Sequence, residues 1–262
     1  MTILARAVLV GLVATASVTG GAQSAAPVAA PLQAAPLQAA PQVDTAKQIA
    51  TMQTKLDDWA QLVRYRAANA ALPAPAEGER RVVFYGDSIT DSWAQTPSEF
   101  FPGRNYVGRG ISGQTTPQML VRFQQDVVHL KPAVVVVLAG TNDIAGNTGP
   151  SSPEMIEDNF ESMAAIAKAN GIRLVISSIL PASHYPWKPE AQPAEPIRAM
   201  NMRLKALAAR EGLVYLDYYT PMANAQGGLD PELAHDGVHP TPKGYAVMSP
   251  LAEKAIAEAL SR

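Results

Sequence analysis

Five short apolar runs recur along the chain from residue 81 onward, and longer stretches with helical patterns separate them. The runs cover residues 82–85, 105–107, 134–138, 174–178 and 213–216. Residues 134–138 read Val-Val-Val-Val-Leu, with no alternation of apolar and polar positions. Such a run is typical of a parallel strand that is buried on both faces. The pattern therefore predicts a five-stranded parallel sheet.

Helical patterns alternate with these strands. Residues 155–169 and 197–209 place apolar side chains three and four positions apart, and residues 243–260 close the chain in the same way. This alternation predicts a doubly wound, three-layer α/β domain over residues 76–262. In that architecture, functional sites form outside the carboxyl ends of the strands.

An apolar stripe precedes this domain. Its members alternate at spacings of three and four and predict one helix over residues 44–71: Ile49, Met52, Leu56, Trp59 and Val63. Leu-Pro-Ala-Pro at residues 72–75 ends the helix and connects it to the domain. We expect the stripe to pack on its own domain, and pairing with another chain as a coiled coil is the alternative.

The first 43 residues carry signals for export rather than for folding. Arg6 precedes an apolar stretch at residues 7–18 that is too short to span a bilayer. Ala22-Gln23-Ser24 fits a small-x-small cleavage site, so residues 1–24 are expected to be a signal peptide. An Ala/Pro/Gln-rich linker follows at residues 25–43. We therefore expect an exported protein, periplasmic or secreted, with no stable membrane anchor.

The composition limits the classes of function that the chain can have. The chain has 262 residues, 47% of them hydrophobic, which suits one catalytic domain with appendages. Its net charge of −2 is spread along the sequence and gives no basic face for a nucleic acid. The absence of cysteine excludes a thiol nucleophile, a disulfide framework and a zinc-thiolate site.

Glycine and polar residues gather directly after the predicted strands. Gly86-Asp87-Ser88 follows the first strand, residues 110–115 the second and residues 140–143 the third, and residues 236–239 come after the fifth. In a parallel sheet, these four segments lie at the same edge. The sequence thus predicts that they converge.

The converging residues suit the transfer of an acyl group. A serine hydroxyl needs a base to take its proton, so Ser88 is the candidate nucleophile and His239 the base. Asp236 would hold the imidazole ring of His239 in the required orientation. A backbone N–H at Gly113, the side-chain amide of Asn142 and the N–H of Ser88 would stabilise an oxyanion.

These segments resemble the four sequence blocks of the SGNH hydrolases, also called GDSL esterases and lipases. The blocks are Gly86-Asp87-Ser88-Ile89, Gly113 within Ile-Ser-Gly-Gln-Thr, Asn142 within Gly-Thr-Asn-Asp, and Asp236-Gly-Val-His239. Within the family, the chain is most similar to the branch with proteins like platelet-activating-factor acetylhydrolase and carbohydrate acetylesterases. The resemblance implies a flavodoxin-like fold and a Ser88-His239-Asp236 triad, with Gly113 and Asn142 in the oxyanion hole. Ile89 replaces the leucine of the family's name, at a position with no chemical role.

The resemblance further implies a serine esterase that needs no cofactor and removes short acyl groups, acetyl first, from a carbohydrate or other small ester. A serine hydrolase of the other common α/β type would carry a second glycine where Thr90 stands. A metal-dependent phosphoesterase would need paired ligands around residues 140–143, and the chain has only four histidines. We therefore expect no metal.

Two alternative functions stay open. An acyltransferase could use the same fold to pass the acyl group to a sugar hydroxyl. A non-catalytic carbohydrate-binding module is the other alternative, although binding alone needs no triad. Trp93, His184 and Trp187 are candidates for a substrate-binding wall, with packing of exposed loops as an equal alternative. Asp87 and Asp143 are expected to accept hydrogen bonds from loop backbone.

Overall fold

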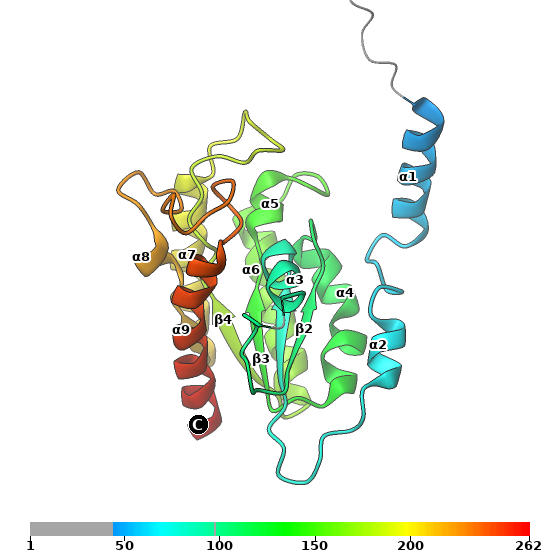
Figure 1. Cartoon of the computed structure of the whole chain (residues 1–262), viewed down its shortest axis with the longest axis vertical. Helices are drawn as coiled ribbons and strands as arrows, with labels where there is room; N and C mark the ends of the chain where they lie inside the picture. Colours follow the sequence, from blue (N-terminus) through cyan, green and yellow to red (C-terminus); the bar gives the residue numbers. More distant parts are fainter. Residues whose placement is uncertain (1–43, 97) are drawn as a thin grey trace, which may run out of the picture. The chain divides into compact units, whose positions relative to one another are not determined.

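The computed structural model describes residues 44–96 and 98–262, and in them the five predicted strands pair into one parallel sheet (Figure 1). The strands are β1 (Val82–Gly86), β2 (Tyr106–Gly110), β3 (Val134–Leu138), β4 (Arg173–Ser177) and β5 (Val214–Leu216). Their order in the sheet is β2-β1-β3-β4-β5. The predicted fold class is confirmed. The second strand begins at residue 106 and runs three residues beyond its predicted end.

Helices cover both faces of the sheet. Their bounds are α1 (Thr45–Asp57), α2 (Arg66–Ala71), α3 (Ser88–Ala94), α4 (Thr116–Asp126), α5 (Thr141–Ala145), α6 (Pro153–Ala169), α7 (Ala194–Glu211), α8 (Tyr219–Met222) and α9 (Pro242–Ser261), with a short 3₁₀ turn at Val128–Leu130. Side chains of α4, α6 and α7 pack on one face, and those of α3, α8 and α9 pack on the other.

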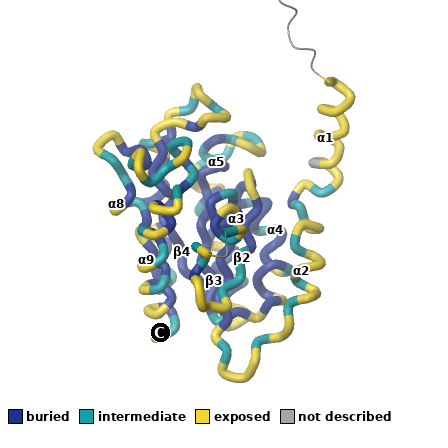
Figure 2. The backbone as a smooth tube through the Cα atoms, in the orientation of Figure 1, coloured by how far each residue is buried: buried dark blue, intermediate teal, exposed yellow. Residues whose placement is uncertain are grey.

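Successive strand residues supply these two cores alternately. Val83 and Tyr85 of β1 contribute to the core under α4, α6 and α7, whereas Val82 and Phe84 contribute to the opposite one. Because side chains alternate between the faces of a strand, a run without polar positions is buried on both sides. Figure 2 shows the strands as buried backbone inside a partly exposed shell of helices.

The N-terminal helix differs from its prediction in two respects. It is divided into α1 and α2, because the Asp58 carboxylate accepts the backbone N–H groups of Leu62 and Val63 and thereby ends the first helix. The predicted packing of the apolar stripe on the domain is wrong, since all five of its members are exposed: Ile49, Met52, Leu56, Trp59 and Val63. The predicted end of the helix is confirmed, because Leu72 is already extended.

Polar contacts, rather than the apolar stripe, hold the segment between α1 and α2 to the domain. Three glutamine side-chain amides donate to its backbone carbonyls: Gln118 to Trp59 at 2.6 Å, Gln114 to Ala60 at 2.8 Å and Gln125 to Leu62 at 2.8 Å. In α2, Asn69 donates to Asp126 at 2.6 Å and accepts from the Arg109 guanidinium at 2.7 Å. The segment therefore supports α4 and the loop before it.

The predicted signal peptide and linker, residues 1–43, lie outside the described residues. Among the residues that the structure describes, none of the helices combines the length and the apolar character that crossing a membrane requires.

A buried arginine joins the ends of two strands. Arg122 of α4 has no exposed surface, and its guanidinium donates to the carbonyls of Gly86 at 3.0 Å and Arg109 at 2.9 Å. The same group donates to the Gln114 side chain at 2.5 Å and pairs with the buried Asp126 at 3.1 Å. The central carbon of the Arg122 guanidinium lies 4.2 Å from the centre of the Tyr85 ring. One cation thus fixes the carboxyl ends of β1 and β2 and the following loop.

We expect Arg122→Met to lower the free energy of unfolding by about 3–5 kcal/mol, because it leaves the Asp126 carboxylate buried without its cation. Arg203→Met is the matched control, since Arg203 pairs with Glu154 and Glu157 at a partly exposed position and its loss should cost about 1 kcal/mol or less. Urea denaturation of the two variants measures the difference. Equal costs would mean that the buried network does not stabilise the fold.

Candidate active site

Ser88 is the first residue of α3 and follows the end of β1 after a single residue. Asp87 caps the helix, because its carboxylate accepts the Ile89 N–H at 3.0 Å. Gly86 is required before it, since a Cβ there would lie 2.2 Å from the Thr90 hydroxyl oxygen and 2.7 Å from the Leu138 carbonyl oxygen. Close packing of the turn against β3 thus places the serine at the carboxyl edge of the sheet.

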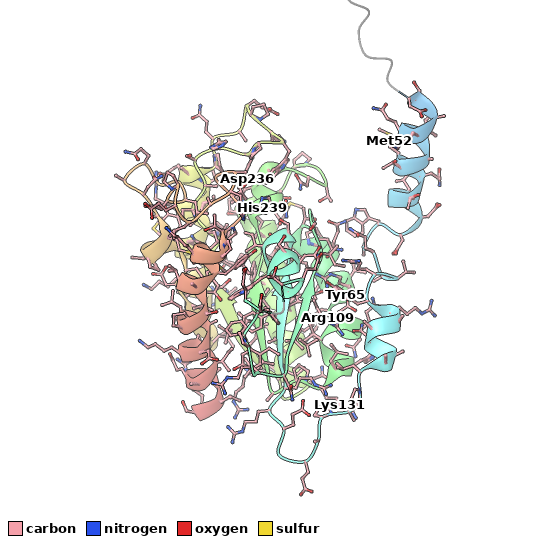
Figure 3. All side chains as sticks on the ribbon, in the orientation of Figure 1. Met52, Tyr65, Arg109, Lys131, Asp236 and His239 are labelled. Carbon is pink, nitrogen blue, oxygen red and sulfur yellow. The ribbon has the colours of Figure 1, made fainter. Side chains whose placement is uncertain are left out.

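The two ends of the predicted triad meet at this edge. The Ser88 hydroxyl lies 2.9 Å from Nε2 of His239, and Nδ1 of His239 lies 2.8 Å from Oδ2 of Asp236. In Figure 3, Asp236 and His239 lie side by side at the end of the molecule opposite Lys131, which precedes β3. In this order the hydroxyl can give its proton to the imidazole, and the carboxylate can hold the ring and stabilise the charge that it gains.

The turn at residues 236–239 orients its own side chains. Oδ1 of Asp236 accepts the backbone N–H groups of Val238 at 3.0 Å and His239 at 2.9 Å. Burial raises the pKa of Asp236, but these bonds and the His239 ring outweigh it and hold the pKa below its usual value. The carboxylate therefore stays ionised beside the imidazole. Gly237 has a φ of +84°, and a Cβ there would lie 2.7 Å from the His184 ring.

The predicted oxyanion donors lie on the two neighbouring loops. Asn142 is buried in the first turn of α5, and its Nδ2 donates to the Gln114 carbonyl at 3.0 Å, with a longer contact of 3.4 Å to Asp87. Gly113 has a φ of +80°, a conformation that favours glycine, and a Cβ there would lie 4.0 Å from Nδ2 of Asn147. These contacts hold the Asn142 amide between the Gly113 loop and the turn that carries Ser88.

Two buried carboxylates support these loops, as expected from the sequence. Asp143 accepts the backbone N–H of Thr116 at 3.0 Å and its hydroxyl at 2.6 Å, which joins α5 to the start of α4. Asp87 has no exposed surface, and burial raises the pKa of its carboxyl to about 7. The Ile89 N–H and the His239 ring oppose this rise in pKa, and Asp143 adds to it.

The three candidates for a substrate wall separate into two groups. Trp93 is only 2% exposed, stacks on Tyr245 with ring centres 4.9 Å apart and belongs to the core, so its predicted role in binding substrate is corrected. His184 and Trp187 are exposed beside the turn at residues 236–239. The Trp187 ring lies 6.1 Å from that of His239 and stacks on Tyr185 at 5.0 Å.

One residue at the site has no signal in the sequence. Asn147 follows α5, and its side chain bonds to Asn142, to the Gly113 carbonyl and to Trp187. A second asparagine in a glycine-rich loop has the composition of an ordinary turn, so no spacing or motif distinguishes it.

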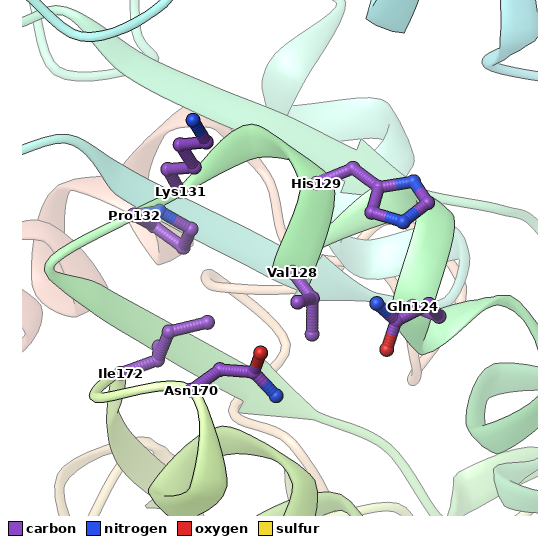
Figure 4. A pocket seen from close by; sticks show the side chains of 7 residues that line it. All are labelled: Gln124, Val128, His129, Lys131, Pro132, Asn170 and Ile172. Carbon is purple, nitrogen blue, oxygen red and sulfur yellow. The ribbon is translucent and has the colours of Figure 1, made fainter.

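A cavity of about 520 Å³ lies away from this site (Figure 4). Its lining comes from the segments before β3 and β4: Gln124, Val128, His129, Lys131, Pro132, Asn170 and Ile172. The cavity is therefore at the amino edge of the sheet, opposite Ser88.

Comparisons with known proteins show the family to which the chain belongs. The model of the GDSL-like Lipase/Acylhydrolase family matches residues 84–247. A GDSL-like lipase of Bacteroides thetaiotaomicron is 44% identical, with a TM-score of 0.74 over 76% of this chain and 98% of its own. Platelet-activating factor acetylhydrolase IB subunit alpha1 of Pongo abelii is 26% identical over 64% of this chain and 71% of its own. A mutant of an acetyl-xylooligosaccharide esterase from Geobacillus, 19% identical with a TM-score of 0.56 over 71% and 96% of the two chains, shares the fold.

Asp87 should make stability depend on pH in a defined window. The pKa of Asp87 is about 7 in the folded state and about 3.9 in the unfolded state. Between these two pH values the folded state binds more protons than the unfolded state, so the free energy of unfolding falls as pH rises. We expect the stability of Asp87→Asn relative to the wild type to grow across that window, by at most about 1.4 kcal/mol per pH unit, and to level off above it. Urea denaturation between pH 4 and about 8 measures this. A pH-independent difference would show that Asp87 is ionised throughout.

Proposed function

Because this chain belongs to the GDSL-like lipase and acylhydrolase family and is an ester-hydrolysing enzyme, we propose that Ser88, His239 and Asp236 are its catalytic triad. One observation carries the proposal: the hydroxyl, the imidazole and the carboxylate are joined by contacts of 2.9 and 2.8 Å. Ser88 and His239 lie 151 positions apart in the sequence, near the two ends of the domain's chain, and only the fold brings them together.

The geometry supports a two-step reaction. Oγ of Ser88 attacks the ester carbonyl carbon while Nε2 of His239 takes its proton. His239 then gives this proton to the oxygen of the departing alcohol, and an acyl-serine is left. Water attacks the acyl-serine as His239 removes a proton from it, and the acid leaves as Ser88 regains its hydrogen. The ionised Asp236 stabilises the imidazolium and fixes the ring so that Nε2 faces Ser88.

Negative charge develops on the carbonyl oxygen in both steps. We assign its stabilisation to the N–H groups of Ser88 and Gly113 and to Nδ2 of Asn142. Fixed donors of this kind act without reorganising when the charge forms. The buried position of Asn142 and its bond to Gln114 provide that rigidity.

We propose short acyl esters, acetyl first, of a carbohydrate or another small alcohol as the substrates. Two proteins similar to this chain, an acetylhydrolase and an acetyl-xylooligosaccharide esterase by name, support the acetyl group. Trp187 supports the carbohydrate, because an indole that is 42% exposed beside the base offers an apolar face to a sugar ring.

Export of the protein, periplasmic or secreted, is also proposed. It rests on the sequence of residues 1–24 alone, where Arg6, the apolar stretch and Ala22-Gln23-Ser24 match a signal peptide.

Ser88→Ala should reduce kcat for 4-nitrophenyl acetate by a factor on the order of 10³ or more and abolish labelling by a fluorophosphonate probe. Ser92→Ala is the matched control, since Ser92 is exposed on the same helix, and it should keep full activity and labelling. Circular dichroism checks that both variants fold. Turnover retained by folded Ser88→Ala would remove Ser88 from the role of nucleophile.

The proposed substrate class predicts a decline of kcat/KM along the series 4-nitrophenyl acetate, butyrate and octanoate. It also predicts release of acetate from acetylated xylo-oligosaccharides, with the deacetylated sugars as the blank. A preference for octanoate, or no acetate released, would contradict this substrate class while leaving the triad intact.

A further inference from the structure

Asn147 uses both ends of its side-chain amide to join three segments of the site. Its Nδ2 donates to Oδ1 of Asn142 at 2.8 Å and to the Gly113 carbonyl at 3.2 Å. Its Oδ1 accepts the indole N–H of Trp187 at 3.2 Å. The partners belong to the loop after β2, to α5 and to the loop after β4. An exposed residue with this set of bonds links the two proposed oxyanion donors to the segment beside His239.

The bond to Asn142 determines which way that amide faces. With Oδ1 of Asn142 held by Asn147, Nδ2 is directed to the other side, towards the Gln114 carbonyl and Asp87. A flipped Asn142 amide would place its NH₂ group against that of Asn147 and lose both bonds. Because an asparagine amide has two nearly isosteric orientations, such a contact is needed to select one.

The backbone reinforces this arrangement. The Asn147 N–H donates to the Asn142 carbonyl at 3.0 Å, so the two asparagines are joined through main chain and side chain together. Gly146 has a φ of +72° and makes the turn that brings Asn147 back over α5. The second Nδ2 bond, to the Gly113 carbonyl, attaches the loop that carries the other oxyanion donor.

We propose that Asn147 is a positioning residue for ester hydrolysis, which orients the Asn142 amide and the Gly113 loop and is itself held by Trp187. This inference rests on the function proposed above. Asn147 acts through Asn142 and the Gly113 loop and does not touch the reacting atoms. A misplacement of about 1 Å at a reacting centre can cost on the order of 10² in rate, so loss of this support should lower kcat by about 10- to 100-fold.

Two substitutions separate the contacts of Asn147. Asn147→Ala removes all of its side-chain bonds. Trp187→Phe keeps an aromatic ring for stacking on Tyr185 but lacks the N–H that Asn147 accepts. We expect Trp187→Phe to lower kcat less than Asn147→Ala does, because both Nδ2 bonds remain. Asn170→Ala is the matched control, since Asn170 is an exposed asparagine that caps α6 at the amino edge of the sheet.

A double-mutant cycle on 4-nitrophenyl acetate tests the proposal. Asn147→Ala should lower kcat about 10- to 100-fold with KM changed by less than about threefold, and Asn142→Ala should lower it on the order of 10²–10³. In the double variant, Asn147→Ala should cause a smaller further loss than it causes alone, because the part of its effect that passes through the Asn142 amide is gone. Asn170→Ala should match the wild type in kcat.

The possible outcomes are distinct. Suppose that the wild type hydrolyses the ester. If kcat of Asn147→Ala is then within twofold of the wild-type value, or if the two substitutions are fully additive in the cycle, the positioning role is overturned and the proposed function stands. A wild type that neither hydrolyses the ester nor takes a fluorophosphonate label at Ser88 would overturn the proposed function, and this inference with it. If Asn147→Ala and Asn170→Ala lowered the urea midpoint equally and both lost kcat to the same extent, Asn147 would have only a structural role.

Discussion

The position of Ser88, the proposed nucleophile, depends on a cation buried at the end of the sheet. The Arg122 guanidinium binds the last carbonyl of β1, the Arg109 carbonyl of β2 and the Gln114 side chain, and Asp126 balances its charge. A buried charge needs both a partner and saturated hydrogen bonds, so this cluster has very few acceptable geometries. The same buried group therefore holds both the turn before Ser88 and the Gly113 loop in place.

The N-terminal segment extends this support outward. Gln114 accepts from Arg122 through its oxygen and donates to the Ala60 carbonyl through its nitrogen, and the Tyr65 hydroxyl donates to the Gly110 carbonyl. The chain before β1 thus braces the loop of the Gly113 donor from behind. The apolar side chains that suggested a packed helix take no part in this, because backbone carbonyls and the polar groups of Tyr65 and Asn69 make the contacts.

The sheet and the triad could be predicted because their signals are local. A strand buried on both faces leaves an unbroken apolar run, the proposed nucleophile Ser88 comes just after such a run, and Asp236 and His239 lie three positions apart on one turn before the last helix. The supporting network could not be predicted in this way. Arg122 and Gln114 have the residue types of a solvated surface, and only the folded chain shows them buried. Trp93 failed as a substrate contact because its place five residues after Ser88 in α3 puts its ring against Tyr245 in the core.

The site therefore combines two kinds of support. Ser88 begins a helix that is anchored by buried groups, whereas Asn147, His184 and Trp187 lie on exposed loops at the same edge. Rigid elements can hold the reacting atoms while loops vary to suit different alcohols and acids. The bond between Trp187 and Asn147 connects the two, because a loop that faces the substrate also holds the amide that orients Asn142. A change in that loop would then alter both which ester binds and how well its oxyanion is stabilised.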